Sequence, residues 1–116
     1  MKTGVVLDKR YADHEMGPQH VESPLRVEVL NHMLGESPPF SFLALAPRPA
    51  AESEIAWAHE QSYIEFLKAT AAEDRVFIDP DTATNAKTYE TALLAAGGLL
   101  SGIDAVMDGQ IGSNSF

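Results

Sequence analysis

Short apolar runs in the chain predict a small number of buried strands. Residues 4–7 (GVVL) form an apolar run near the start, which is typical of a strand buried on both faces of a parallel sheet. Residues 40–45 form a second run, and Pro47 and Pro49 bring it to an end. Residues 76–78 (VFI) fit either a short strand or an ordered loop. The pattern therefore predicts two or three strands.

Two segments carry the signals that start helices. Ser23 and Pro24 open the first predicted helix, because serine supplies a capping oxygen and proline gives up no needed donor in the first turn. Gly35 is predicted to end it. Ser62 and Glu65 have the spacing of a capping box, in which each side chain accepts a hydrogen bond from the other residue's backbone N–H, and they predict a second helix. The side chains on its predicted inner face are Tyr63, Phe66 and Leu67.

Residues 88–107 carry apolar side chains at intervals of three and four, which predicts a long amphipathic helix. These positions are Tyr89, Ala92, Leu93, Ala96, Leu99, Leu100, Ile103, Val106 and Met107. Gly97 and Gly98, at its middle, each cost roughly 1 kcal/mol relative to alanine. Close approach of a neighbouring backbone is the expected compensation, with a slight kink as the alternative. Gly109 is predicted to end the helix, and residues 110–116 to form a flexible tail.

Strands that alternate with helices predict an α/β fold with parallel pairing, in a single domain over residues 1–109. Two or three strands are fewer than a parallel sheet usually contains, and the long helix needs a sheet to cover its apolar face. The face expected to lack a cover surrounds Leu93, Ala96, Leu100 and Ile103. This mismatch predicts either a piece of a larger fold or an obligate oligomer.

The composition narrows the classes of function. The chain has 8 basic and 17 acidic residues and a net charge of −9, so it lacks the basic surface that nucleic-acid binding requires. The absence of cysteine excludes disulfides and thiolate metal sites. The start carries no signal-peptide pattern, and the longest near-apolar run, residues 92–100, is far shorter than a membrane span. A cytoplasmic protein without membrane contact is expected.

The polar segment between the first strand and the first helix collects candidate chemistry. His14 and His20 lie there among carboxylates, where they could bind a metal or move protons. Their spacing matches no specific metal motif, and a surface or hydrogen-bonding role is the alternative. Arg26 follows Glu22 by four residues, which fits an ion pair on a helix.

Two later residues are also candidates. The segment Asp79-Pro80-Asp81-Thr82 is predicted to be a loop, where the carboxylate of Asp81 could accept backbone N–H groups from an extended ligand. A turn or a helix cap is the alternative, and Asp79 could bear the same role. His59 is expected to be structural, with one ring nitrogen bound to a backbone carbonyl.

Five segments together carry a family resemblance. They are residues 3–8 (TGVVLD), 20–26 (HVESPLR), 57–67 (WAHEQSYIEFL), 79–82 (DPDT) and 89–98 (YETALLAAGG). In this order and spacing they resemble the N-terminal third of the histone deacetylase family, which includes bacterial acetoin-utilisation proteins and acetylpolyamine amidohydrolases. Each segment alone is weak, but their order is specific. The resemblance implies part of the three-layer α/β fold of the arginase/deacetylase type.

The same resemblance implies substrate-binding roles for Asp81, Arg26 and His20. Asp81 would hold the backbone of the substrate at the mouth of the channel. Arg26 would lie near the floor of the active site, by the exit route for acetate. His20 belongs to a loop that would border the substrate channel.

Zinc is the cofactor that the resemblance implies for the parent family, but it implies no catalytic or metal-binding residue in this chain. Family members bind zinc with an Asp-x-His pair and a later Asp, activate water with a Pro-Gly-His-His segment, and steady the oxyanion with a Tyr. These motifs do not occur between Met1 and Phe116, and the Pro-Gly-His-His segment is expected shortly afterwards. The chain is therefore expected to be an N-terminal piece of a zinc-dependent hydrolase of acetyl-lysine or acetylpolyamine, inactive alone.

Two other interpretations stay open. The chain could be a stand-alone structural or interaction module, derived from the deacetylase fold, that self-associates through its uncovered helix face. Alternatively, a separate chain could complement it and supply the zinc ligands. The predicted partners are thus a second copy or a complementing chain, and not nucleic acid or a membrane.

Overall fold

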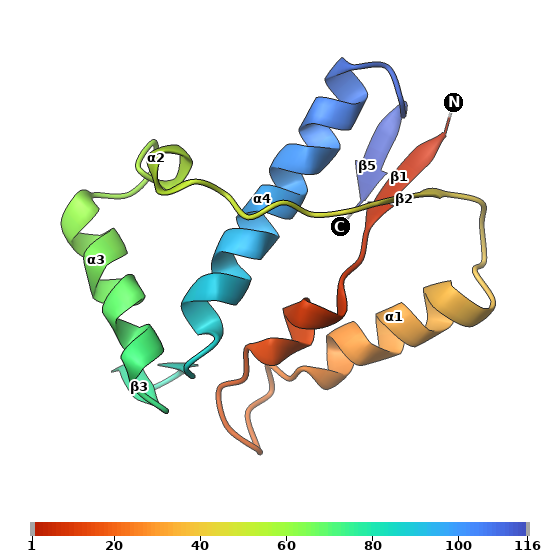
Figure 1. Cartoon of the computed structure of the whole chain (residues 1–116). Coiled ribbons are helices and arrows are strands. Elements are labelled where there is room, and N and C mark those ends of the chain that lie inside the picture. The colour runs from red at the N-terminus through yellow and green to blue at the C-terminus, as the bar shows by residue number, and fades with distance from the viewer. Residues whose placement is uncertain (1, 116) are drawn as a thin grey trace.

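A three-stranded parallel sheet contains the first strand of the chain (Figure 1). The computed structural model describes the backbone of residues 2–115 and the side chains of residues 2–112. The strands are β1 (Thr3–Val6), β2 (Leu43–Leu45) and β5 (Ser113–Ser115), in the order β2-β1-β5. Both outer strands run parallel to β1, whose Val5 and Val6 are buried. The α/β fold with two or three parallel strands is confirmed.

The sequence predicts a flexible tail at residues 110–116, and the structure shows a strand there instead. Gly112 N–H donates to the carbonyl of Lys2 at 2.8 Å, which begins the pairing of β5 with β1. Ile111 is buried against Gly4, where a Cβ would come within 2.5 Å of the Ile111 Cδ1 atom. Strand pairing uses backbone groups that every residue carries, so a polar composition does not exclude it. Phe116, also part of the predicted tail, lies outside the described residues.

A separate antiparallel hairpin is formed by β3 (Val76–Asp79) and β4 (Thr82–Thr84). The register shifts between Phe77 and Asp79, which marks a β-bulge. Thr84 is buried, whereas Phe77 is largely exposed. The segment that the sequence left open between strand and loop is therefore a strand.

The helices enclose the sheet only in part. They are η1 (Lys9–Asp13), α1 (Leu25–Glu36), α2 (Glu52–Ile55), α3 (Gln61–Ala69), η2 (Thr70–Ala72) and α4 (Thr88–Met107), where η denotes a 3-10 helix. At the start of α1, Leu25 N–H donates to the hydroxyl of Ser23 at 3.2 Å, as the sequence predicts. α1 continues through Gly35 to the next residue instead of ending there.

The details of α3 differ from the prediction. The helix begins before Ser62, so the expected capping box does not form, and the Gln61 side chain donates to Glu65 at 2.9 Å. Tyr63 and Phe66 are exposed, and the buried residue of this helix is Ile64. α3 starts two residues earlier than a cap at Ser62 would place it, and the residue of its first turn that lies inside is Ile64.

The backbone of residues 48–50 crosses α4 at Gly97 (Figure 1). A Cβ at Gly97 would lie 1.5 Å from the Arg48 carbonyl oxygen and 2.7 Å from the Ala50 nitrogen, so no side chain fits. Close by, Ala50 N–H donates to the carbonyl of Leu93 at 2.9 Å. The backbone approach that the sequence predicts at this glycine is confirmed.

An ion pair holds the crossing segment at one end. The Arg48 guanidinium donates to both carboxylate oxygens of Glu54 at 2.8 and 2.9 Å, and this hydrogen bonding lowers the pKa of Glu54 to about 2. Glu54 also accepts from Ala51 N–H at 2.9 Å, in the first turn of α2. The segment is thus bound to α2 immediately after it leaves α4.

The buried residues of α4 are mostly small and are not the apolar positions that the spacing singled out. They are Thr91, Leu94, Gly97, Gly98, Gly102 and Ala105. On the face that the sequence expects to lack a cover, Ile103 is 46% exposed, and Leu99 and Met107, four residues to either side, are 45% and 80% exposed. The crossing segment approaches the helix closely at Gly97, where no side chain fits.

By length and composition alone, α4 could cross a membrane, and it is the single helix of the described residues that meets this criterion. A core helix of a globular domain passes the same test. α4 packs against β1, η1, η2 and β5, which accounts for its apolar character. It ends at Gly109, whose positive φ of 76° suits glycine, as the sequence predicts.

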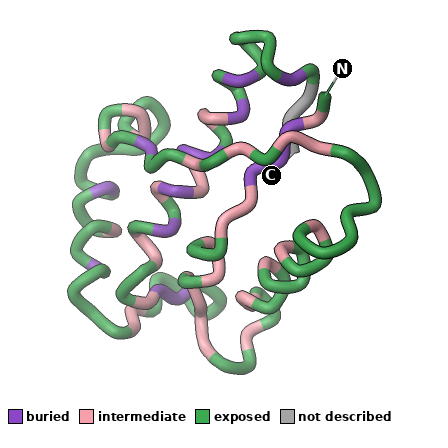
Figure 2. The backbone as a smooth tube through the Cα atoms, turned by 45° about the vertical axis from the view of Figure 1, so that its right-hand side comes forward, coloured by how far each residue is buried: buried purple, intermediate pink, exposed green. Residues whose placement is uncertain are grey.

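α1 lies at the edge of the molecule, and its residues are exposed or of intermediate burial (Figure 2). None of its residues is buried, and Leu25, Val29 and Leu30 are 61%, 55% and 49% exposed. The radius of gyration is 15.6 Å, whereas a compact domain of this length would have about 13 Å. The residues described here therefore form a more open structure than a self-contained domain.

We predict that Gly97→Ala strongly destabilises the chain, because the new methyl group would overlap the backbone of residues 48–50. The expected loss is about 3 kcal/mol or more, the upper end for overpacking. Gly35→Ala is the matched control, since nothing lies within 4 Å of its added Cβ, and the helix propensity of alanine should stabilise α1 by up to about 1 kcal/mol. Urea unfolding followed by circular dichroism measures both, and equal effects would contradict the crossing.

Candidate functional site

Polar contacts bind residues 13–22 to the hairpin β3–β4 and to the start of α4. We call these contacts the polar clamp. Its hydrogen bonds run from Asn85 Nδ2 to the Asp13 carbonyl (2.8 Å), between His14 Nδ1 and Thr88 Oγ1 (2.8 Å), from Arg75 Nη1 to the Glu15 carbonyl (2.7 Å), and between His20 Nε2 and the Asp81 carbonyl (2.9 Å). Arg75 also forms an ion pair with the side chain of Glu15. The segment with the candidate histidines is thus ordered by hydrogen bonds.

His20 and Asp81, which the sequence identified separately, lie in contact. Glu22 N–H donates to His20 Nδ1 at 3.0 Å, so we assign the ring proton to Nε2, which donates to the Asp81 carbonyl. One carboxylate oxygen of Asp81 lies 3.2 Å from the same nitrogen. The side chain of His20 is 19% exposed and that of Asp81 is 91% exposed. The carboxylate therefore projects into solvent while its backbone is held.

Arg26 lies near this pair but does not join it directly. Its guanidinium binds the carboxylate of Glu22, the four-residue ion pair that the sequence predicts. The backbone N–H of Glu22 donates to His20, so Glu22 connects Arg26 with His20. His20 in turn contacts Asp81. The Arg26 side chain is 67% exposed. In the described part of the chain, Arg26 borders an open groove together with Val29 and Leu30.

His14 has a different environment, at the start of α4. The Thr88 hydroxyl donates to Asn85 Oδ1 at 3.0 Å and accepts from Asn85 N–H at 2.8 Å. We therefore assign the proton of His14 Nδ1 as the donor to Thr88. Burial lowers the pKa of His14, against the opposing effect of nearby carboxylates such as Glu22. This histidine is thus held in its neutral form.

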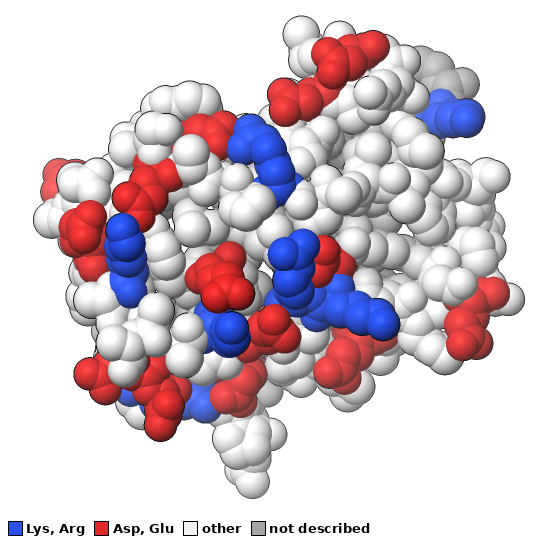
Figure 3. Space-filling model, in the orientation of Figure 1, with Lys and Arg blue, Asp and Glu red and all other residues white. Residues whose placement is uncertain are grey.

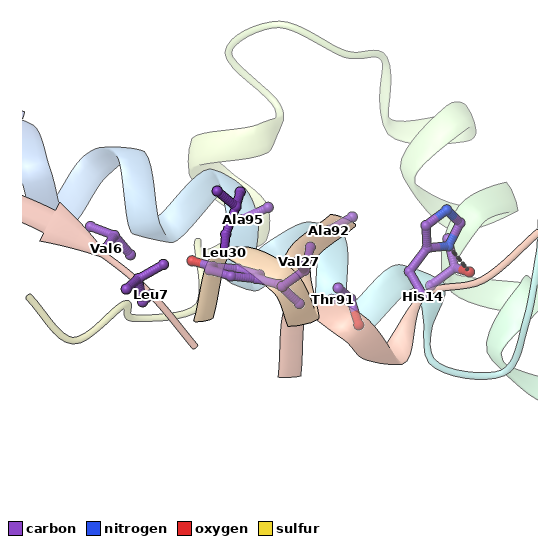
Figure 4. Close-up of a pocket in the computed structure, with 10 residues that line it drawn as sticks. Val6, Leu7, His14, Val27, Leu30, Thr91, Ala92 and Ala95 are labelled. Atoms are coloured by element: carbon purple, nitrogen blue, oxygen red, sulfur yellow. Dashed lines mark hydrogen bonds between the residues drawn. The ribbon is translucent and has the colours of Figure 1, made fainter. Parts of the chain in front are cut away.

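An apolar cavity of about 380 Å³ lies between α1, β1 and α4 (Figure 4). Val6 and Leu7 lie toward one end and His14 at the other. Tyr11 lines it too; its hydroxyl donates to the Leu94 carbonyl at 3.1 Å, and burial raises its pKa to about 12. Most of the lining surface is apolar, so the cavity offers a space for side chains or apolar groups, and His14 and Tyr11 are its titratable residues.

Charge is distributed without a single dominant patch on the face shown in Figure 3, where basic and acidic side chains alternate at the centre. Several of them are paired, such as Lys68 with Glu52 at 2.9 Å and Arg10 with Asp8 at 2.8 Å.

The described residues offer no arrangement of side chains suited to a metal ion. Within residues 2–112, no three histidine or carboxylate side chains gather closely enough to hold a metal ion.

Some residues of the site were not found from the sequence. Arg75 and Asn85 are central to the polar clamp, but neither belongs to a recognisable motif. The one signal in the sequence was the position of Arg75, a basic residue directly after Glu73 and Asp74 and next to a predicted strand. The hydrogen bond predicted between the His59 ring and a backbone carbonyl is not present among the described residues. The ring lies 5.4 Å from that of Tyr63 between centroids.

Comparison with known proteins identifies the class. The histone deacetylase domain matches residues 20–116. A probable deacetylase from Archaeoglobus fulgidus is 31% identical over 111 residues, covering 93% of this chain and 31% of that protein. An uncharacterized protein from Synechocystis is 28% identical over 108 residues, covering 90% and 36% of the two chains. The crystal structure of the HDA15 HD domain matches with a TM-score of 0.87 at 22% identity, covering 98% of this chain and 34% of that one.

The fold is thus that of an α/β deacetylase domain in its matched part. The chain belongs to the histone deacetylase family, since the domain of that family matches most of its residues. It spans about a third of the length of the relatives that it matches. The zinc that the family implies does not fit the described residues, because they offer no ligand set for it.

We predict that acidification destabilises the chain through His14. Its pKa lies below 6.5 in the folded state, so unfolding takes up a proton when the pH falls below about 6.5. The contribution of His14 to the free energy of unfolding is complete above that pH and is lost as the pH falls toward the folded pKa. His14→Asn retains an N–H donor for Thr88 but does not titrate. Urea unfolding at pH 7.5 and 5.5 should show a smaller loss in this variant, and an equal loss would contradict the assignment.

Proposed function

We propose that this chain supplies the substrate-entrance side of a zinc-dependent deacetylase domain that hydrolyses the amide of acetyl-lysine or of an acetylated polyamine. The observation that carries the proposal is the exposed carboxylate of Asp81, held by His20 where residues 13–22 meet the β3–β4 turn. A carboxylate presented in this way can accept N–H groups of an extended ligand. Membership of the histone deacetylase family supports the type of reaction.

The proposal assigns binding to this chain and hydrolysis to residues outside it. A zinc hydrolase needs three protein ligands and an open position on the metal. Residues 2–112 provide no such group, so we place the zinc ligands and the catalytic residues in the part of the domain that the relatives have in addition. We propose that the domain acts in the cytoplasm.

We predict that the purified chain shows no turnover of acetyl-lysine peptides or acetylpolyamines with zinc present. A chimera in which this chain replaces the matched segment of the Archaeoglobus relative should be active. In the chimera, Asp81→Asn should raise KM about tenfold, since weakening one charge-assisted hydrogen bond costs about 1.5 kcal/mol.

Asp79→Asn is the matched control for this test, because Asp79 accepts Asp81 N–H at 2.8 Å and is the other carboxylate of the turn. A larger KM effect at Asp79 would transfer the role to that residue. Turnover by the chain alone, or an inactive but folded chimera, would contradict the proposed function.

A second candidate function is favoured by the apolar surface left on α4 and α1. Leu99, Ile103 and Met107 lie exposed on one helix, and Leu25 and Val29 on the other. Such a surface is typical of one that a partner covers. Under this alternative the chain is a structural module that self-associates, or that binds a complementing chain carrying the zinc ligands.

We predict that Ile103→Glu distinguishes self-association from the binding of a complementing chain. If two copies cover the surface, the wild-type chain should be a dimer at micromolar concentration, since about 800 Å² per partner is typical of a stable dimer. The buried charge should then make the variant monomeric. Light scattering with sedimentation measures both, and a monomeric wild-type chain would rule out self-association. Ser62→Glu, at an exposed neutral residue of α3, controls for the same change of charge.

A further inference from the structure

We propose that His20 is the positioning residue for the Asp81 carboxylate, and this inference rests on the proposed function. The two residues are 61 positions apart in the sequence, yet His20 Nε2 lies 2.9 Å from the Asp81 carbonyl oxygen. The histidine acts through its partner, and its own ring is mostly shielded from solvent. The geometry therefore assigns it a different role from that of a residue in contact with substrate.

Both ring nitrogens of His20 are used, and this fixes the ring. Nδ1 accepts from Glu22 N–H at 3.0 Å, within its own segment. Nε2 donates across to Asp81. A ring held at two opposite atoms has one orientation and one tautomer, so its N–H is directed at a fixed point in space. That point is the backbone of the turn between β3 and β4.

The turn itself is held from both sides at Asp81. Its N–H donates to Asp79 Oδ1 at 2.8 Å, and its carbonyl accepts from His20. With both backbone groups engaged, the direction of the side chain is limited to its own rotamers. The nearer carboxylate oxygen lies 3.2 Å from His20 Nε2, which favours one of these rotamers. The remaining carboxylate surface stays open to a ligand.

His20 differs in this respect from the other members of the polar clamp. Asp13, Glu15 and His14 bind Asn85, Arg75 and Thr88, which lie at the base of the hairpin and at the start of α4. These contacts place the segment as a whole. Among the side chains of residues 13–22, His20 is the one that reaches the tip of the hairpin.

Two substitutions separate the hydrogen bond from His20 to Asp81 from the hydrogen bond between Glu22 and His20 within the loop. In His20→Gln, the side-chain amide nitrogen replaces Nε2 and can still donate to Asp81. In His20→Asn, the side-chain oxygen replaces Nδ1 and can still accept from Glu22, but the donor to Asp81 is lost. Backbone amide exchange at Asp81, measured by NMR on the full chain, should be about tenfold faster in His20→Asn and within about twofold of wild type in His20→Gln. His32→Asn, at an exposed histidine of α1, is the matched control.

The chimera described above provides the functional measurement. His20→Asn should raise KM about tenfold with little change in kcat, and His20→Gln should restore KM to within about threefold of wild type. Equal exchange at Asp81 in both variants, or a KM loss in His20→Gln as large as in His20→Asn, would overturn the proposal. An inactive wild-type chimera would contradict the proposed function instead, and the exchange measurement would still decide the role of His20.

Discussion

The crossing of residues 48–50 over Gly97 is the contact on which the placement of α4 depends. Backbone meets backbone there, so the helix can neither rotate nor slide without a clash with Arg48. The hydrogen bond from Ala50 N–H to the Leu93 carbonyl also fixes the orientation of the crossing segment on the helix. The crossing thereby selects which face of α4 is buried and which face remains toward solvent. It also places Thr88, at the start of the same helix, within reach of His14.

The extent of α4 could be predicted from the sequence, but its buried face could not. Residues 88–107 were expected to be helical, and the helix has those bounds. The periodic pattern ranks residues by apolarity, which selects an apolar face that includes Leu99 and Ile103. Burial was decided instead by how closely other backbone segments approach, and Gly97 and Ala105 satisfy that condition. A pattern of apolar residues carries no information on the distance between backbones.

The strands show the same limit in another form. β1 was predictable because it is apolar and buried on both faces. β5 was predicted as a flexible tail, because its pairing depends on backbone groups and on Ile111 packing against Gly4. Such a contact joins the two ends of the described chain. Only the three-dimensional fold brings these ends together.

The candidate site was predictable residue by residue but not as an arrangement. His20 was singled out from the polar segment before α1, and Asp81 from the turn chemistry of its own segment. Their contact depends on how a long polar segment lies against a hairpin, and Arg75 contributes to this through hydrogen bonds to Glu15 and Thr84. Hydrogen bonds between segments distant in sequence leave no periodic pattern. The family resemblance supplied the roles, and the structure adds the link between the two residues.

The polar clamp and the uncovered apolar surface demand different partners. A net hydrogen bond contributes about 0.5–1.5 kcal/mol, and partly exposed ion pairs contribute about 1 kcal/mol or less. The clamp therefore orders the site through direction, with a modest contribution to stability. A polar, extended molecule can exploit fixed directions, whereas the exposed faces of α1 and α4 offer only apolar area. Under the proposed function these demands are met separately, the first by substrate and the second by the rest of the domain. The open cavity between α1 and α4 is also expected to be covered by the rest of the domain, because most of its lining surface is apolar.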